Sequence, residues 1–169
     1  MSAPEPRGTG VPAALLACPL FEKVAADPEA LGALTRICGL VRVRAGEVVF
    51  SEGSQGDALY VIRVGRVRTE KQTPDRDPYT VRFFDQGDFF GELSLLEDMP
   101  RSATVVAETD GEFLVLSRDL FQGWCDAYPK SGLEVTRQVA QRLAERLRRV
   151  SEDVVTLFSA LVNEIEQRL

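Results

Sequence analysis

Hydrophobic residues in the first quarter of the chain recur at helical spacing. Between residues 13 and 40 this pattern is interrupted only by Pro19 and Pro28, which predicts one or two short helices. Residues 1–12 are rich in proline and glycine and lack the pattern, so we predict that they are disordered.

The pattern changes at Val41. From there to residue 117, short segments of valine, isoleucine, phenylalanine and tyrosine are separated by glycine or aspartate turns. Such regular spacing is typical of an antiparallel β-sandwich or β-barrel. The polar run 73–78 predicts the tip of a hairpin. Aromatic residues at strand spacing are expected in the core: Tyr60, Phe83, Phe84, Phe89 and Phe90.

The remaining residues predict helices. Residues 118–128 fit a helix that stops near Pro129, and residues 131–169 fit one long helix. Its apolar residues follow the alternating steps of a coiled-coil seam: Leu143, Leu147, Val150, Val154, Leu157 and Leu161. At the standard rise this helix is about 58 Å long, too long for one small domain to cover. We therefore expect a parallel homodimer through residues 131–169; the alternative is that the seam packs on the chain's own β-domain.

Composition narrows the possible functions. The chain has 169 residues and a formal net charge of -6, which argues against a general affinity for nucleic acid or anionic membranes. The three cysteines are isolated, which fits a reducing compartment and predicts a cytoplasmic protein. No apolar run is long enough to predict a membrane span. The chain contains no histidine, and histidine is the residue that most often serves as a general base or a transition-metal ligand. We therefore predict no catalytic residues, no metal and no enzymatic activity.

The segment 90–105 carries the clearest chemical signal. It places the carboxylate of Glu92 nine residues before the guanidinium of Arg101, in a stretch that is otherwise mostly apolar. Charged side chains are rarely buried without a partner, and a ligand with both an anion and a hydroxyl would supply partners for both. Gly91 allows a tight turn into a short helix whose first N–H groups favour an anion. Arg101 could clamp that anion with two parallel hydrogen bonds.

This segment resembles the phosphate-binding cassette of the cyclic-nucleotide-binding domains, whose motif reads Phe-Gly-Glu and then Pro-Arg-x-Ala-Thr. A second family signature lies upstream, in the glycines and aspartate of residues 46–65. The resemblance covers roughly residues 15–160. It implies a mainly β fold: a jelly-roll-like antiparallel β-barrel with N-terminal helices and a long C-terminal dimerisation helix. The domain division is then 1–12 disordered, 13–130 the binding domain and 131–169 the long helix.

The resemblance also implies roles for individual residues. It assigns the cyclic phosphate to Arg101, the ribose 2′-OH to Glu92, and the sugar-phosphate also to backbone N–H groups from Gly91 to Leu93. Ser94 replaces the usual alanine and is small enough to fit. Ser102 could bind a phosphate oxygen or a guanine amine, so the nucleotide stays open: we favour cAMP over cGMP, with a cyclic dinucleotide as a further alternative. The expected ligand-binding residues are Gly91, Glu92, Leu93, Ser94, Arg101, Ser102 and Ala103.

The part of the site that would cover the base departs from the family pattern. In the catabolite-activator branch, a threonine on the long helix contacts the adenine amine, and Val150 takes its place here. Valine can neither donate nor accept a hydrogen bond. We therefore expect the adenine to be held in one of three ways: by stacking, by Ser151 beside Val150, or by Arg146 or Arg149 lying over its face.

These expectations combine into a stand-alone regulatory sensor that binds a cyclic nucleotide and relays its occupancy through the C-terminal helix to a partner protein. The DNA-reading head of the catabolite-activator branch would follow Leu169, and the long helix carries balanced charge, so no DNA binding is expected. Two alternatives stay open. One is a ligand-free dimeric scaffold of the same fold, and the other is a transcription-regulator-like protein without its own helix-turn-helix.

Overall fold

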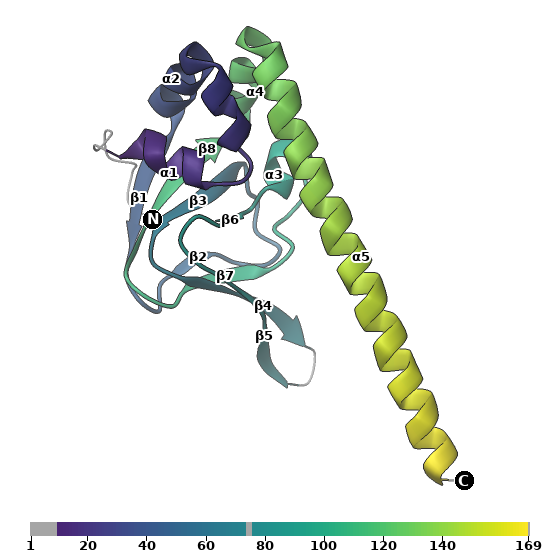
Figure 1. The fold of residues 1–169 in the computed structure, drawn as a ribbon. Helices are drawn as coiled ribbons and strands as arrows, with labels where there is room; N and C mark the ends of the chain where they lie inside the picture. The colour runs from purple at the N-terminus through teal and green to yellow at the C-terminus, as the bar shows by residue number, and fades with distance from the viewer. Residues whose placement is uncertain (1–9, 74–75, 169) are drawn as a thin grey trace. The chain divides into compact units, whose positions relative to one another are not determined.

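The computed structural model describes residues 10–73 and 76–168. The chain divides into two compact units, Met1–Val135 and Thr136–Leu169. The first contains all the strands and every helix except most of the last one, so it holds the core and the residues of the 90–105 segment (Figure 1).

In the described residues that precede the sheets, the chain forms α1 (Val11–Ala17), the 3-10 helix η1 (Glu22–Ala26) and α2 (Pro28–Ile37). Asp27 caps α2 by accepting a hydrogen bond from the backbone N–H of Ala30 at 3.0 Å. The predicted disordered segment 1–12 extends too far, because α1 already begins at Val11. That side chain is only 2% exposed, so its burial fixes the start of the helix. Residues 1–9 lie outside the described residues.

Two four-stranded antiparallel sheets follow, and their order confirms a mainly β, jelly-roll-like fold (Figure 1). The first has the order β1-β8-β3-β6 and the second β2-β7-β4-β5. The strands are β1 (Gly39–Val43), β2 (Val48–Phe50), β3 (Ala58–Val64), β4 (Val67–Thr73), β5 (Arg76–Phe84), β6 (Phe89–Phe90), β7 (Thr104–Ala107) and β8 (Gly111–Ser117).

The expected barrel needs a correction. In the part of the chain that the structure describes, no ladder of hydrogen bonds joins one sheet to the other, so the sheets form an open sandwich. The outer strands β1, β6, β2 and β5 each pair on one side only. Closure would require those edges to pair, and local alternation of apolar residues carries no information about such pairing.

The core lies between the two sheets. Phe90 stacks on Tyr60 with the ring centroids 5.1 Å apart, and it meets Phe113 edge-on at 5.6 Å. The opposite sheet contributes further buried side chains to the same cluster: Val49, Val67, Phe84, Val105 and Ala107. Interdigitation of the inner faces of both sheets therefore provides the main stabilisation by apolar burial.

One aromatic residue expected in the core lies outside it. Phe83 is 44% exposed, and the guanidinium of Arg66 lies over its ring at 4.5 Å. Neighbouring residues of a strand point to opposite faces, and Phe84, paired with Val67, takes the inner face. The prediction that Phe83 is a core residue was wrong for this reason. In the same hairpin β4 ends at Thr73 and β5 begins at Arg76, and the predicted tip at 74–75 lies outside the described residues.

Three helices complete the chain: α3 (Leu93–Leu96), α4 (Arg118–Ala127) and α5 (Pro129–Arg168). The indole N–H of Trp124 donates to the buried carbonyl of Ala30 at 2.9 Å, which fixes α4 on α2. The Ser131 hydroxyl, in the first turns of α5, donates to the Asp27 carboxylate at 3.2 Å. These bonds unite the short N-terminal helices with α4 and the start of α5 inside the first unit.

The second unit is the greater part of α5. This helix begins at Pro129 rather than at the predicted residue 131, because proline is well tolerated in a first turn, where its missing N–H has no helical partner. Within the unit the seam residues Leu147, Val150, Val154, Leu157 and Leu161 are each more than half exposed. Among the described residues, no helix combines the length and apolar character needed to cross a membrane.

Candidate ligand-binding site

The 90–105 segment runs from the end of β6 to the start of β7 and turns sharply at Gly91. Gly91 has a φ of 77°, a left-handed conformation that favours glycine. A side chain there would also approach the Nη1 atom of Arg101 to 2.7 Å and the Ala58 carbonyl to 2.9 Å. The short helix α3 follows at once, so the glycine lets the chain turn directly from a buried strand into the helix.

Arg101 is buried in a slot of the first unit. Its side chain is 6% exposed, and its guanidinium carbon lies 4.0 Å from the centroid of the Phe50 ring. The Nη1 atom donates to the Ser94 hydroxyl at 2.8 Å and more weakly to the Gly91 carbonyl at 3.5 Å. Gly56 closes the slot: a Cβ there would overlap the Nε and Cζ atoms of Arg101 and lie 2.7 Å from its Cδ. The slot therefore combines two glycines, the aromatic rings of Phe50 and Tyr60, and one hydroxyl.

The electrostatics of this slot favour an anion. The Nε atom of Arg101 is a buried nitrogen without a hydrogen-bond partner in the described residues. Burial lowers the pKa of Arg101 from its usual value, while Tyr60, Asp57 and Glu92 partly oppose that shift. A buried cation with an unused donor is costly, and an anionic ligand would relieve that cost.

Backbone hydrogen bonds fix Arg101 to the loop between β2 and β3. Its N–H donates to the Ser54 carbonyl at 2.8 Å, and its own carbonyl accepts from the Gly53 N–H at 2.8 Å. This loop also contains Gly56. The upstream glycine signature and the cassette, separated in sequence, therefore meet in one site.

The structure brings together four of the predicted ligand-binding residues. Gly91 and Ser94 contact Arg101 directly, and Glu92, at the N-cap position of α3, is 3% exposed. Leu93 and Ala103 are half-buried beside them in sequence, whereas Ser102 is exposed. An acidic and a basic side chain are thus buried in one short segment, an arrangement suited to a ligand with a hydroxyl and an anionic group.

The predicted base lid lies on α5, in the second unit. Arg149, Val150 and Ser151 are exposed there, and Arg146 is half-buried. The Ser151 hydroxyl donates to the Leu147 carbonyl at 3.0 Å, one turn earlier in the helix. The lid stays a prediction.

Sequence reasoning missed Arg118, the first residue of α4. Its Nε donates to the Ser94 carbonyl at 2.5 Å, and its Nη2 donates to the Gly56 carbonyl at 3.2 Å. Nη1 forms an ion pair with Asp98 at 3.1 Å. Arg118 therefore joins α3 and the β2–β3 loop to the start of α4. The only sequence signal was a basic residue directly after the last strand. Phe50 and Gly56 were missed in the same way, since the pattern marks them as a strand residue and a turn glycine.

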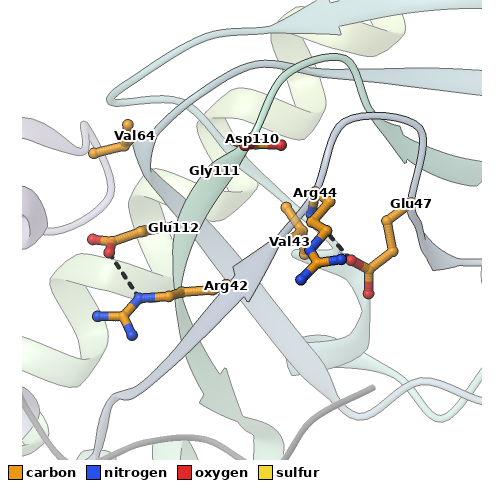
Figure 2. A pocket seen from close by; sticks show the side chains of 8 residues that line it. All are labelled: Arg42, Val43, Arg44, Glu47, Val64, Asp110, Gly111 and Glu112. Atoms are coloured by element: carbon orange, nitrogen blue, oxygen red, sulfur yellow. Dashed lines mark hydrogen bonds and ion pairs between the residues drawn. The ribbon is translucent and has the colours of Figure 1, made fainter.

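A separate surface pocket of about 690 Å³ contains none of these residues. Its lining includes Arg42, Arg44, Glu47, Asp110 and Glu112 (Figure 2). Its carboxylates are already engaged: Glu112 accepts from Arg42 Nε at 3.0 Å, Glu47 from the Arg44 N–H at 3.0 Å, and Asp110 from the Ala45 N–H at 2.8 Å. The pocket offers no unused buried polar group comparable to Arg101, so the slot remains the better candidate site.

Comparison with known proteins agrees with this geometry. Residues 40–128 match the model of the cyclic nucleotide-binding domain. The CRP-like cAMP-activated global transcriptional regulator of Mycobacterium tuberculosis is 32% identical over 132 residues, which are 78% of this chain and 57% of the regulator. The chain thus spans little more than half the length of this relative.

Solved structures give the same picture. The Thermus thermophilus catabolite activator protein superposes with a TM-score of 0.72 at 31% identity, covering 82% of this chain and 62% of that protein. The regulatory domain of Toxoplasma gondii PKA, crystallised with cAMP, gives a TM-score of 0.64 at 28% identity, covering 74% and 49%.

One similar protein is named as an enzyme. The lysophospholipase nte1 of Aspergillus fumigatus is 31% identical over 109 residues, which are 64% of this chain and 7% of the enzyme. The shared segment is thus a small part of that protein, whereas the regulators are matched over about half of their length or more. The two sheets, the 90–105 segment and the match over residues 40–128 agree with one another, and the chain belongs to the cyclic nucleotide-binding domain family.

Proposed function

We propose that this chain is a regulatory sensor that binds a cyclic mononucleotide, cAMP in preference to cGMP. The observation that carries the proposal is the Arg101 slot: a buried guanidinium with an unpartnered Nε, next to a buried carboxylate at Glu92. The guanidinium would bind the cyclic phosphate, and Glu92, an acceptor, would bind the ribose 2′-OH. The names of the relatives support cAMP, since the M. tuberculosis regulator is described as cAMP-activated and the PKA domain was crystallised with cAMP.

Calorimetric titration of cAMP and of cGMP into the purified chain tests this function, with Arg101→Ala alongside. Removing one partner of a buried, hydrogen-bonded charge pair costs about 2–5 kcal/mol of binding. We expect binding of cAMP that the substitution abolishes, and weaker binding of cGMP. A folded chain that releases no heat with either nucleotide would favour the ligand-free scaffold instead.

The relay would run through α5. Its seam is exposed over several turns, and a second copy of the helix would bury it as a coiled coil, which supports a parallel homodimer. A ligand shifts the arrangement of such a dimer only by binding its two states unequally. The output would pass to a downstream protein partner. Sedimentation of the chain and of Leu157→Arg tests the dimer: the substitution should give a monomer, and an unchanged sedimentation profile would argue against this seam.

The same proposal includes no catalytic step and no metal or cofactor. The described residues contain no group of three histidine, cysteine or carboxylate side chains that could hold a metal ion. Among the described residues, no disulfide joins Cys18, Cys38 or Cys125, which supports a reducing compartment such as the cytoplasm.

A further inference from the structure

The C-terminal half of α5, the yellow end of the chain in Figure 1, carries a second apolar stripe beside the seam. Its residues follow one another at alternating steps of three and four, so they share one side of the helix. They are Val155, Phe158, Val162 and Ile165. Val162 is half-buried, but Phe158 is 67% exposed, and Val155 and Ile165 are also more than half exposed. Most of this stripe is therefore open to solvent.

The stripe and the seam together form one broad apolar face. Val154, Leu157 and Leu161 of the seam each directly precede a stripe residue, and neighbouring residues of a helix lie about 100° apart around its axis. A two-stranded coiled coil buries only the narrow seam, whereas a helix in a larger bundle has an apolar face that extends to one flank of the seam. Two copies of α5 joined along the seam would thus leave both of their stripes exposed.

The broad face stops toward the middle of α5. Seven residues, or about two turns, before Val155 and Phe158, the same side of the helix carries Arg148 and Ser151, which are both polar and exposed. The surface beside the seam therefore changes from polar to apolar within one helix. A contact that covers the apolar part would extend over residues 155–165.

The polar residues in this half of α5 are acidic where they are charged. Between residues 150 and 167 the helix carries Glu152, Asp153, Glu164 and Glu166 and no basic side chain; Arg168 follows and pairs with Glu164 at 2.5 Å. The other arginines of the helix lie earlier: Arg137, Arg142, Arg146, Arg148 and Arg149. The broad apolar face thus coincides with an acidic border.

We propose that residues 152–166 of α5 bind an amphipathic helix of a partner protein, with basic residues along the margins of its apolar face. The dimer would hold one such helix beside each copy of α5. The inference rests on the proposed function, because it supplies the docking surface for the relay to a downstream protein. The apolar side of the partner helix would cover Phe158 and its neighbours, and lysine or arginine at its margins would face the acidic border.

The acidic border also argues against two other occupants. A further copy of α5 would bring the same acidic residues to the contact, so like charges would meet. An anionic lipid surface attracts helices with basic polar faces, whereas this polar face is acidic. A basic partner helix therefore fits both the width and the charge of the surface.

Fluorescence anisotropy with two labelled synthetic peptides tests this surface on the full chain. Both peptides have leucine at the i, i+3, i+4 and i+7 positions of one helix face. Their remaining positions are lysine in one peptide and glutamate in the other. We expect the lysine peptide to bind the unaltered chain about tenfold or more tighter than the glutamate peptide, because only the first complements the acidic border.

The double variant Val155→Ser/Phe158→Ser removes the two most exposed residues of the stripe and leaves the charge unchanged. It should weaken binding of the lysine peptide about tenfold or more, since two apolar side chains no longer become buried. Thr156→Ser/Asn163→Ser is the matched control. It introduces the same two serines into the same turns, on the side of α5 opposite the broad face, and should bind as the unaltered chain does. Circular dichroism establishes that both variants keep their helix content.

Each outcome has a distinct meaning. Equal binding of the two peptides, no binding of either, or undiminished binding by Val155→Ser/Phe158→Ser would overturn the docking surface. An equal loss in the control would trace the effect to the stability of the helix and would also overturn it. Sedimentation of the unaltered chain as a tetramer would identify a further copy as the occupant, and cosedimentation with phosphatidylserine vesicles would identify a lipid surface; either result replaces the partner helix. The titration of cAMP tests the proposed function separately, so a chain that binds cAMP but not the lysine peptide refutes the docking surface alone.

Discussion

Gly56→Ala should disable the site without altering any side chain that would touch the ligand. The backbone at this position does not have the positive φ that disfavours alanine, so the added methyl group introduces no backbone strain. Its three nearest contacts are all with Arg101, where it would overlap Nε and Cζ and lie 2.7 Å from Cδ. The arginine has to leave the slot, since two atoms cannot occupy the same volume.

The expected magnitude follows from what Arg101 loses. Leaving the slot breaks the 2.8 Å bond to Ser94 and the stacking over Phe50 at 4.0 Å. The guanidinium is then no longer held where the phosphate would bind. Binding should weaken by about 2–5 kcal/mol, the range for breaking a buried hydrogen-bonded charge pair. At 25 °C this range corresponds to an increase of roughly 30- to 5,000-fold in the dissociation constant for cAMP.

Calorimetric titration of cAMP into Gly56→Ala measures this change, and Gly53→Ala is the control from the same loop. Gly53 has a φ of 76°, and no atom lies within 4 Å of the place that a methyl group would take, so alanine there strains the backbone but touches nothing. It should lower the stability of the fold by about 1–2 kcal/mol and leave the affinity unchanged. If Gly56→Ala binds cAMP as tightly as the unaltered chain, the slot does not position Arg101 for the ligand and the reasoning is refuted.

Three further predictions concern the fold. Gly132→Ala should lower the free energy of unfolding by about 1–3 kcal/mol, because its Cβ would lie 2.9 Å from the Cα of Cys125. Gly123→Ala, with open space around it, should raise the free energy of unfolding by about 0.5–1 kcal/mol. Denaturant titration measures both, and equal effects of the two substitutions would contradict this prediction. Trp124→Phe leaves the buried carbonyl of Ala30 without its donor and should lower the free energy of unfolding by about 1–3 kcal/mol. An unchanged denaturation curve would argue against the bond from the indole N–H to this carbonyl. Burial raises the pKa of Cys38 from 9.0 to about 12, so between these pH values the unfolded chain loses a proton that the folded chain keeps. Stability should therefore fall as pH rises through this window, and the fall should be smaller in Cys38→Ala; denaturation at pH 8 and pH 10 measures both.

The sequence predicted which segments form strands. It predicted neither that the two sheets stay open nor which of Phe83 and Phe84 points into the core. Alternating apolar residues identify strands, because one face of each strand is buried. The same alternation could not decide between Phe83 and Phe84, since either can face inward. Pairing with Val67 decides it, and that pairing depends on register across the hairpin. Whether the sheet edges meet depends in the same way on contacts distant in sequence.

The candidate site shows the same division. The spacing of Glu92 and Arg101 in an apolar stretch correctly predicted two buried charges, which are 3% and 6% exposed. The slot around Arg101 could not be predicted from that stretch. Phe50 and Gly56 belong to the other motif, and only the backbone bonds between Arg101 and the β2–β3 loop bring the two together. The motif thus predicted the residues expected to bind the ligand, whereas it did not predict Phe50 and Gly56, which hold Arg101 in place.

The contrast between Gly56 and Gly91 has a consequence for evolution. Gly91 has two reasons to be glycine, its left-handed backbone and its contact with Arg101, whereas Gly56 has only the contact. In a descendant that gave up the arginine, selection on position 56 would relax at once, while position 91 would stay constrained by its conformation. A side chain at the position of Gly56 would then mark lineages in which the site has fallen out of use, and glycine there together with arginine would mark lineages that keep it.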